Sequence, residues 1–189
     1  MLPVIRSVET LLQHVHAEKP LKYLLFWGHT VRPNEPVGKE CFSQWYPAAF
    51  TLDGDTYATA EHYMMAEKAR LFNDETTRAA ILQAAHPNDA KKLGRRVKGF
   101  DDAQWNAARF AIVVRGNEAK FSQHPAMRDF LLQSGARVLV EASPVDTIWG
   151  IGLAQDSPRA TNPAEWRGLN LLGFALMEVR DNLSLVVGA

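Results

Sequence analysis

One short segment of the chain places acidic and basic side chains among apolar ones at helical spacing. Glu61 and Lys68 fall on the same face of a predicted helix as two methionines, at positions 64 and 65. Because Glu61 lies in the first turn, we expect the positive helix N-terminus to favour its charged form, which suits a base or a stabiliser of cationic charge. Desolvation by the methionines is expected to lower the pKa of Lys68 and make its amine a nucleophile. The same pattern is also typical of a half-buried helix with no chemical role.

A second group of candidate residues follows a predicted strand near residue 141. Glu141 and Asp146 supply two carboxylates to the loop that comes next. Trp149 supplies an indole, and the small residues Gly150 and Gly152 let the backbone come close to a ligand. Such a loop can bind a sugar or a base, and a simple turn around a core tryptophan has the same composition.

Basic residues are concentrated just before a predicted long helix. They are Lys91, Lys92, Arg95, Arg96 and Lys98. A run of this kind is either a local phosphate site or a solvated helix face. Trp105 and Arg109 follow, one helical turn apart; they can hold a nucleobase or serve as ordinary core and surface residues.

The composition excludes several classes of protein. Hydrophobic residues make up 47% and charged residues 22% of the 189 residues, so the chain is neither disordered nor fibrous. Lys plus Arg equals Asp plus Glu, at 21 each, so no global field attracts nucleic acid or an anionic membrane. The single cysteine, Cys41, excludes an intramolecular disulfide, and no His, Cys and carboxylate cluster has the spacing of a metal site. We therefore predict a site without a metal or other cofactor.

The cellular location of the protein is predicted from the absence of a membrane span and of a secretory signal in its sequence. No apolar stretch approaches the roughly 20 residues of a membrane span. Residues 1–19 carry charges where a secretory signal would be apolar. With one cysteine, this indicates a cytoplasmic protein without a membrane partner, and the sequence carries no signal for an oligomeric state.

The elements that must position these residues are mostly helices. Periodicity and capping residues predict helices over residues 4–18, 60–72, 73–86, 87–99, 125–134 and 169–182, and a long one from residue 101. Thr59, Asn73 and Asp101 are the predicted N-caps. Strands are predicted at residues 22–27 and 137–141, with a hairpin of residues 50–52 and 56–58 around Asp53-Gly54. Residues 29–47 and 143–163 are predicted to be ordered but irregular.

These elements predict a mainly α fold with a small β-sheet and hairpin component, in a single compact domain. Residues 1–20 are predicted to form an N-terminal helical extension, and residues 21–189 the domain that carries the site. No repeat and no domain-sized linker divides the chain.

A series of short matches, in one order along the chain, resembles the NADAR family, also called the YbiA-like N-glycosidases. The matching pieces are Phe26-Trp27-Gly28, Phe42-Ser43-x-Trp45, Thr59-x-Glu61-His62-Tyr63 with Lys68-Ala69, Leu93-Gly94-Arg95, Trp105-x3-Arg109, Lys120-Phe121, Glu141-x-Ser143-Pro144-x-Asp146-x2-Trp149-Gly150-Ile151-Gly152, and Asn170-x-Leu172-Gly173 with Leu176-Met177-x-Val179-Arg180. The first twenty residues fall outside the pattern. Gln44 stands where the family more often has asparagine, which is expected to alter contacts near the ligand.

The resemblance implies a largely helical fold that acts on ribose joined to a base through nitrogen. Family catalytic positions correspond to Glu61 and Asp146, and Lys68 matches a lysine placed for an imine with the opened ribose. Substrate-binding roles are predicted for Trp27, Gly28, Ser43, Arg95, Trp105, Arg109, Trp149, Gly150 and Asn170.

The implied substrate is a small phosphoribosyl compound. Members that resemble this chain are associated with hydrolysis of phosphoribosyl-amine intermediates of riboflavin biosynthesis, and others remove ADP-ribose from guanine in nucleic acid. We therefore predict an N-glycosidase that hydrolyses the C1′–N bond of a phosphorylated ribosyl-amine. Two alternatives stay open: an ADP-ribosyl hydrolase, for which nucleic acid is only a modified substrate, and a non-catalytic ADP-ribose or NAD binder. The balanced charge favours a small substrate.

Overall fold

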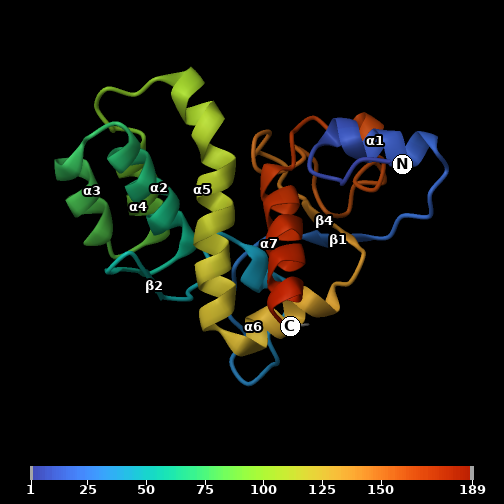
Figure 1. Ribbon diagram of the computed structural model, residues 1–189, viewed down its shortest axis with the longest axis horizontal. Helices are drawn as coiled ribbons and strands as arrows, with labels where there is room; N and C mark the ends of the chain where they lie inside the picture. The colour runs from blue at the N-terminus through green and yellow to red at the C-terminus, as the bar shows by residue number, and fades with distance from the viewer. Residues whose placement is uncertain (1, 188–189) are drawn as a thin grey trace.

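Seven α-helices and four short strands follow one another along the part of the chain described by the computed structural model, residues 2–187 (Figure 1). Residue 1 and residues 188–189, the outermost positions of the two predicted segments, lie outside it. The helices are α1 (Val8–His16), α2 (Ala60–Leu71), α3 (Glu75–Leu82), α4 (Pro87–Gly94), α5 (Asp102–Gln123), α6 (Pro125–Gln133) and α7 (Leu171–Val187). The strands are β1 (Tyr23–Phe26), β2 (Phe50–Leu52), β3 (Asp55–Tyr57) and β4 (Val138–Glu141), and 3-10 turns occur at Lys39–Phe42 and Pro163–Glu165. The predicted mainly α fold with a small β component is confirmed.

Local hydrogen bonds explain where several elements begin. The Thr59 side chain accepts a hydrogen bond from the backbone of His62 at the start of α2, and Asp101 caps α5 in the same way. The β2–β3 hairpin turns at Asp53 and Gly54, which both have positive φ angles (54° and 87°), as expected for this dipeptide.

The predicted cap at Asn73 is wrong. Asn73 has a φ of 58° and lies just after α2, where a left-handed residue redirects the chain. Asp74 is the N-cap of α3, because its side chain accepts a hydrogen bond from the backbone of Thr77. The helix also ends at Leu82 instead of residue 86.

The first and last predicted helices are displaced as well. α1 begins at Val8 because Ser7 forms a capping box with Thr10. α7 begins at Leu171 and continues to Val187, past the predicted end at residue 182. In front of α7, Asn170 takes a positive φ of 53°.

A parallel pair of strands forms the base of one half of the molecule. β1 and β4 align in register from Tyr23 with Val138 to Phe26 with Glu141. The first three residues of β4 are fully buried, and α7 packs against this strand and against α5 (Figure 1). Because the strands are parallel, their carboxyl ends deliver Trp27 and Glu141 to the same edge.

The other half is built around α2, which packs against α3, α4 and α5 (Figure 1). Every residue of α2 from Ala60 to Glu67 is buried, so the helix has no solvent-facing side over this stretch. Two glycines permit this packing: a Cβ at Gly94 would collide with the side chain of Met65, and a Cβ at Gly116 with the ring of Tyr63. These close approaches bring α4 and α5 against the residues of α2 that the sequence singled out.

The N-terminal segment packs on the half that contains α7. Leu11 of α1 is fully buried, and the Arg6 guanidinium forms ion pairs with Glu178 (3.2 Å) and Asp181 (2.6 Å) of α7. No helix among residues 2–187 is long and apolar enough to cross a membrane.

Candidate active site

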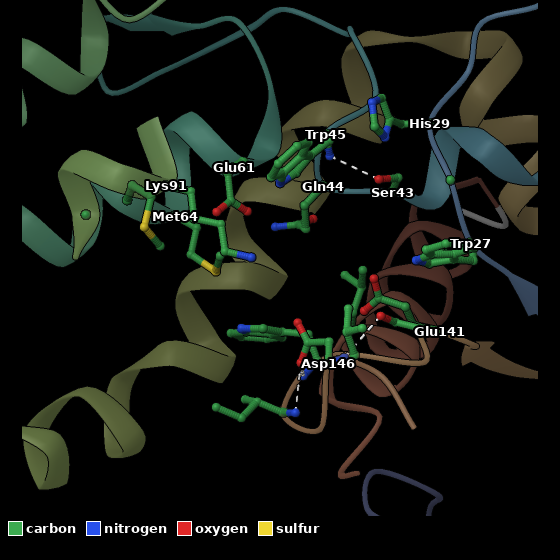
Figure 2. Close-up of a pocket in the computed structure, with 18 of the residues that line it drawn as sticks. Trp27, His29, Ser43, Gln44, Trp45, Glu61, Met64, Lys91, Glu141 and Asp146 are labelled. Atoms are coloured by element: carbon green, nitrogen blue, oxygen red, sulfur yellow. Dashed lines mark hydrogen bonds between the residues drawn. The ribbon is translucent and has the colours of Figure 1, made fainter. Parts of the chain in front are cut away.

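A cavity of about 890 Å³ lies between the α2–α4 half and the carboxyl ends of β1 and β4. This volume suits a nucleotide-sized ligand. Its charged lining residues are Glu61, Lys68, Lys91, Arg95, Glu141 and Asp146, and its tryptophans are Trp27, Trp45, Trp105 and Trp149. Figure 2 shows Glu61 on one wall, with Asp146 and Glu141 on the facing side. Segments far apart in sequence therefore meet in one polar and aromatic pocket.

Glu61 is held at the N-terminus of α2 by the loop before the hairpin. Its backbone N–H donates a 2.9 Å hydrogen bond to the carbonyl of Gln44. The residue is only 4% exposed, and burial raises the pKa of its carboxyl to about 7; the Lys91 ammonium and the Trp45 indole offset part of that effect. Burial thus opposes the helix N-terminus, which was expected to favour the charged form, and Glu61 changes charge closer to neutral pH than an exposed glutamate does. Desolvation outweighs the helix dipole.

Lys68 lies two turns further along α2 and lines the same cavity. Its Nζ is 4.2 Å from the ring centroid of Phe100 and 5.6 Å from that of Trp105. Burial lowers the pKa of its ammonium, as the sequence predicted. The cavity wall around Lys68 thus contains aromatic rings as well as Met64 and Met65. These rings exclude water from the ammonium group and also stabilise its positive charge.

Asp146 is fixed in its loop by hydrogen bonds from the backbone. Oδ1 accepts hydrogen bonds from the N–H groups of Ile148 and Trp149, both at 2.8 Å. The backbone N–H of Asp146 donates to the Ser143 hydroxyl at 3.2 Å (Figure 2). Two donors engage Oδ1, so Oδ2 is the oxygen left to meet a ligand. The same hydrogen bonds orient Trp149 beside it.

Glu141 is a third acidic residue of the cavity. It ends β4, and its backbone N–H donates to the side chain of Asn170 at 2.9 Å. Burial raises the pKa of its carboxyl to about 8, and the nearby charges of Asp146 and Glu61 add to this rise. The cavity thus holds two glutamates whose pKa values are raised by burial, and groups of this kind are typical of sites that transfer protons.

The loop that carries Ser43, Gln44 and Trp45 is fastened by a buried lysine. Lys120 of α5 is fully buried, and its Nζ donates to the carbonyls of Cys41 (2.7 Å) and Ser43 (2.9 Å). Burial lowers the pKa of Lys120 to about 8. Two carbonyl acceptors at the end of a 3-10 turn are thereby satisfied.

The orientation of the Gln44 amide follows from its neighbour on α5. The Asn117 Nδ2 group donates to the carbonyl of Val113 at 2.9 Å, and a carbonyl can only accept. The same NH₂ group therefore donates its second hydrogen to Oε1 of Gln44, at 2.9 Å. The Gln44 NH₂ group is consequently the end that is free to donate to a ligand in the cavity. The expected effect of glutamine in place of asparagine at position 44 concerns this contact, and it stays a prediction.

Most of the predicted binding residues line the cavity. Trp27, Gly28, Ser43, Arg95, Trp105 and Trp149 all do, together with Glu61, Lys68 and Asp146. Trp27 is 56% exposed and therefore lies at the rim, whereas Trp105 is buried. Lys91 and Arg95 both line the cavity, whereas Lys98 of the same basic run does not.

Three predicted binding residues lie outside the lining. Arg109 faces Asp146 closely enough for the two charges to interact, while burial lowers its pKa. A Cβ at Gly150 would stand 2.9 Å from the Glu141 carbonyl, so this glycine allows the loop to pack on β4. Asn170 is fully buried and bonds the backbone of Glu141 and of Leu139, both at 2.9 Å. Gly150 and Asn170 therefore position β4 and the loop that follows it, and they do not line the cavity themselves.

Several lining residues were not among the predicted binding set. Gln44, Trp45, Lys91 and Glu141 all face the cavity. Trp45 and Glu141 belong to the matched sequence motifs, which is the signal that could have identified them. The sequence spacing does not distinguish Lys91, which lines the cavity, from Lys92, which is exposed to solvent.

Among residues 2–187, no three His, Cys, Asp or Glu side chains form a group that could hold a metal ion. The prediction of metal-independent chemistry remains to be tested by experiment.

Comparison with known proteins places the chain in a family. The model of the NADAR domain matches residues 25–184. An N-glycosidase of Acanthamoeba polyphaga mimivirus is 42% identical over 165 residues, which is 85% of this chain and 95% of that protein. The N-glycosidase YbiA of Escherichia coli is 31% identical over 144 residues, or 76% of this chain and 81% of YbiA.

The fold agrees with this relationship. The NMR structure of the E. coli protein YbiA superposes with a TM-score of 0.67 at 27% identity, covering 87% of this chain and 86% of YbiA. The predicted enzyme class, a hydrolase of N-glycosidic bonds, is confirmed by the relatives named N-glycosidase. On the sequence match and the shared fold together, the chain belongs to the NADAR family.

Proposed function

We propose that this protein hydrolyses the C1′–N bond of a phosphorylated ribosyl-amine, of the class formed as intermediates of riboflavin biosynthesis. The observation that carries the proposal is the meeting of Glu61 and Asp146 across one cavity that also contains two tryptophans, Trp105 and Trp149. Cleavage of this bond develops oxocarbenium character on the ribose, which a nearby carboxylate stabilises.

Glu61 and Asp146 supply that stabilisation from opposite sides. Glu61, with a pKa of about 7, changes charge near neutral pH, so its ionised form can stabilise C1′ or accept a proton from attacking water. Oδ2 of Asp146 is available to orient a ribose hydroxyl, because Oδ1 already accepts two backbone hydrogen bonds.

The basic residues and the tryptophans bind the ends of the substrate. Lys91 of α4 and Arg95, which directly follows this helix, both line the cavity. These two cations bind the phosphate of the substrate. Trp105 and Trp149 offer flat faces to a heterocycle, and stacking of this kind contributes roughly 1–3 kcal/mol per base.

We assign this chemistry to residues 21–189. All cavity-lining residues belong to that part of the chain, the first being Phe26. We assign residues 1–20 to an N-terminal extension without a chemical role; its α1 packs on the half of the molecule that contains α7.

The test compares two substrates in separate incubations. Purified protein is mixed with a ribosyl-amine 5-phosphate of the riboflavin pathway, or with DNA carrying ADP-ribosylated guanine, and release of the free base is followed by chromatography. We expect release from the ribosyl-amine. Release only from modified guanine would instead identify an ADP-ribosyl hydrolase, and ligand affinity without release would identify a binding module.

A variant separates catalysis from folding. Glu61→Gln keeps the size of the side chain but removes its charge. We expect the rate of base release to fall about a hundredfold or more, with little loss of thermal stability. A near-normal rate would remove Glu61 from the mechanism.

A further inference from the structure

Glu141 occupies a position in the cavity that the proposed mechanism leaves unused. It is the last residue of β4, and it pairs in register with Phe26, so Trp27 follows directly beside it. Figure 2 shows Glu141 and Trp27 on one side of the cavity, with Lys91 and Glu61 on the other. A substrate that sets its phosphate near Lys91 and its ribose near Glu61 therefore extends its base toward Glu141.

The carboxyl group of Glu141 lacks protein partners. Oε2 is buried and has no hydrogen-bond partner among the described residues. The hydrogen bonds of this residue to Asn170 and to Ile151 are made by its backbone N–H and carbonyl, not by its carboxyl group. A buried carboxylate without donors is costly, whereas a neutral carboxyl group is tolerated and can donate its own hydrogen.

The charges around Glu141 also favour the protonated form. Asp146 from the following loop and Glu61 from α2 face it with negative charge, and Lys91 of α4 is the one opposing cation among the groups that affect it. Burial and these two charges raise the pKa of Glu141 to about 8, which favours the protonated form at neutral pH.

We propose that Glu141 is the general acid of the reaction, and that it donates its proton to the nitrogen that leaves C1′. This inference rests on the proposed function. It assigns protonation of the leaving nitrogen to Glu141, and stabilisation of the positive charge on the ribose to Glu61 and Asp146.

The step balances in protons and electrons. As the C1′–N bond breaks, its electron pair goes to nitrogen, which takes the proton from Glu141 and departs as the neutral amine. Water adds to C1′ and gives one proton to the ionised carboxylate of Glu61. Exchange of one proton with solvent at each carboxyl group then restores the starting state.

The test uses leaving groups that differ in their need for a proton. The wild type, Glu141→Gln and Asp146→Asn are assayed on a ribosyl-amine 5-phosphate and on 4-nitrophenyl riboside 5-phosphate, whose phenolate departs without protonation. For Glu141→Gln we expect kcat on the amine to fall about a hundredfold or more, and kcat on the nitrophenyl compound to fall less than about fivefold. Asp146→Asn should slow both substrates alike.

Glu9→Gln, on the exposed face of α1, is the matched control and should leave both rates unchanged. Equal losses on both substrates would overturn the proposal and would indicate that Glu141 binds the ribose. A normal rate of Glu141→Gln on the amine would overturn it as well.

A measurement without turnover separates this proposal from the proposed function. In protein labelled with ¹³C at the glutamate carboxyl carbons, the signal that Glu141→Gln removes should stay at the position of a neutral carboxyl group at about pH 7. A signal already at the carboxylate position at that pH would overturn the proposal, even in a protein that hydrolyses no ribosyl-amine. Failure of base release with a neutral Glu141 would contradict the proposed function instead.

Discussion

Replacing the buried carboxyl groups by amides should make the protein more stable at alkaline pH. In the folded state Glu61 and Glu141 have pKa values of about 7 and about 8, against an ordinary value of 4.5. Between these values the folded chain binds more protons than the unfolded chain, so stability must fall as the pH rises through this window. Glu61→Gln and Glu141→Gln abolish their share of this fall, because an amide does not ionise.

The magnitude follows from the raised pKa values. Each unit of difference in pKa between the folded and unfolded states corresponds to about 1.4 kcal/mol of unfolding free energy. Ionisation of Glu61, whose pKa rises from 4.5 to about 7, therefore lowers the stability of the protein by roughly 3 kcal/mol. Ionisation of Glu141, whose pKa rises to about 8, lowers it by roughly 5 kcal/mol. The charge of Glu61 is one of the causes that raise the pKa of Glu141, so part of the figure for Glu141 disappears once Glu61 is replaced. The double variant should therefore gain less than the two single variants added together.

The assay is urea unfolding at about pH 5, 7 and 9, with each variant compared with the wild type at the same pH. This comparison cancels groups common to both proteins, such as Lys120, whose lowered pKa favours the folded state as the pH rises from about 8. We expect near equality at pH 5 and a more stable Glu141→Gln at pH 9. A variant that is less stable than the wild type at pH 9 would refute the reasoning, since the carboxylate would then be well solvated or paired.

Further predictions concern the substrate and the chemistry. Arg95→Ala should raise KM for a phosphorylated substrate and barely change it for the dephosphorylated analogue; equal effects would move the phosphate elsewhere. Because water attacks C1′ directly in the step proposed above, borohydride added during turnover should trap no sugar on the protein. A sugar adduct on the peptide that contains Lys68, which Lys68→Ala abolishes, would replace that step with an imine to the opened ribose. Activity should be unchanged by a strong chelator, and loss that added zinc or magnesium restores would contradict metal independence.

Local features of this protein were determined by its sequence. Thr59 and Asp101 cap their helices, and Asp53-Gly54 turns the hairpin, because these residues satisfy or redirect the neighbouring backbone whatever lies further along the chain. The matched motifs likewise identified Glu61, Lys68 and Asp146 as residues of one site, since the order of short motifs is visible without coordinates.

Only the tertiary structure decided what surrounds these residues. The helix position of Glu61 predicted a charged group, but burial from all sides raises its pKa, and desolvation depends on neighbours distant in sequence. Asn170 belongs to a motif near the site, yet its side chain serves the backbone of β4. The sequence indicates Glu141 as one carboxylate of a candidate loop, but the burial of its Oε2 without a donor is visible only in the tertiary structure. Spacing along the chain predicts which residues share an element, whereas burial and charge depend on which elements meet.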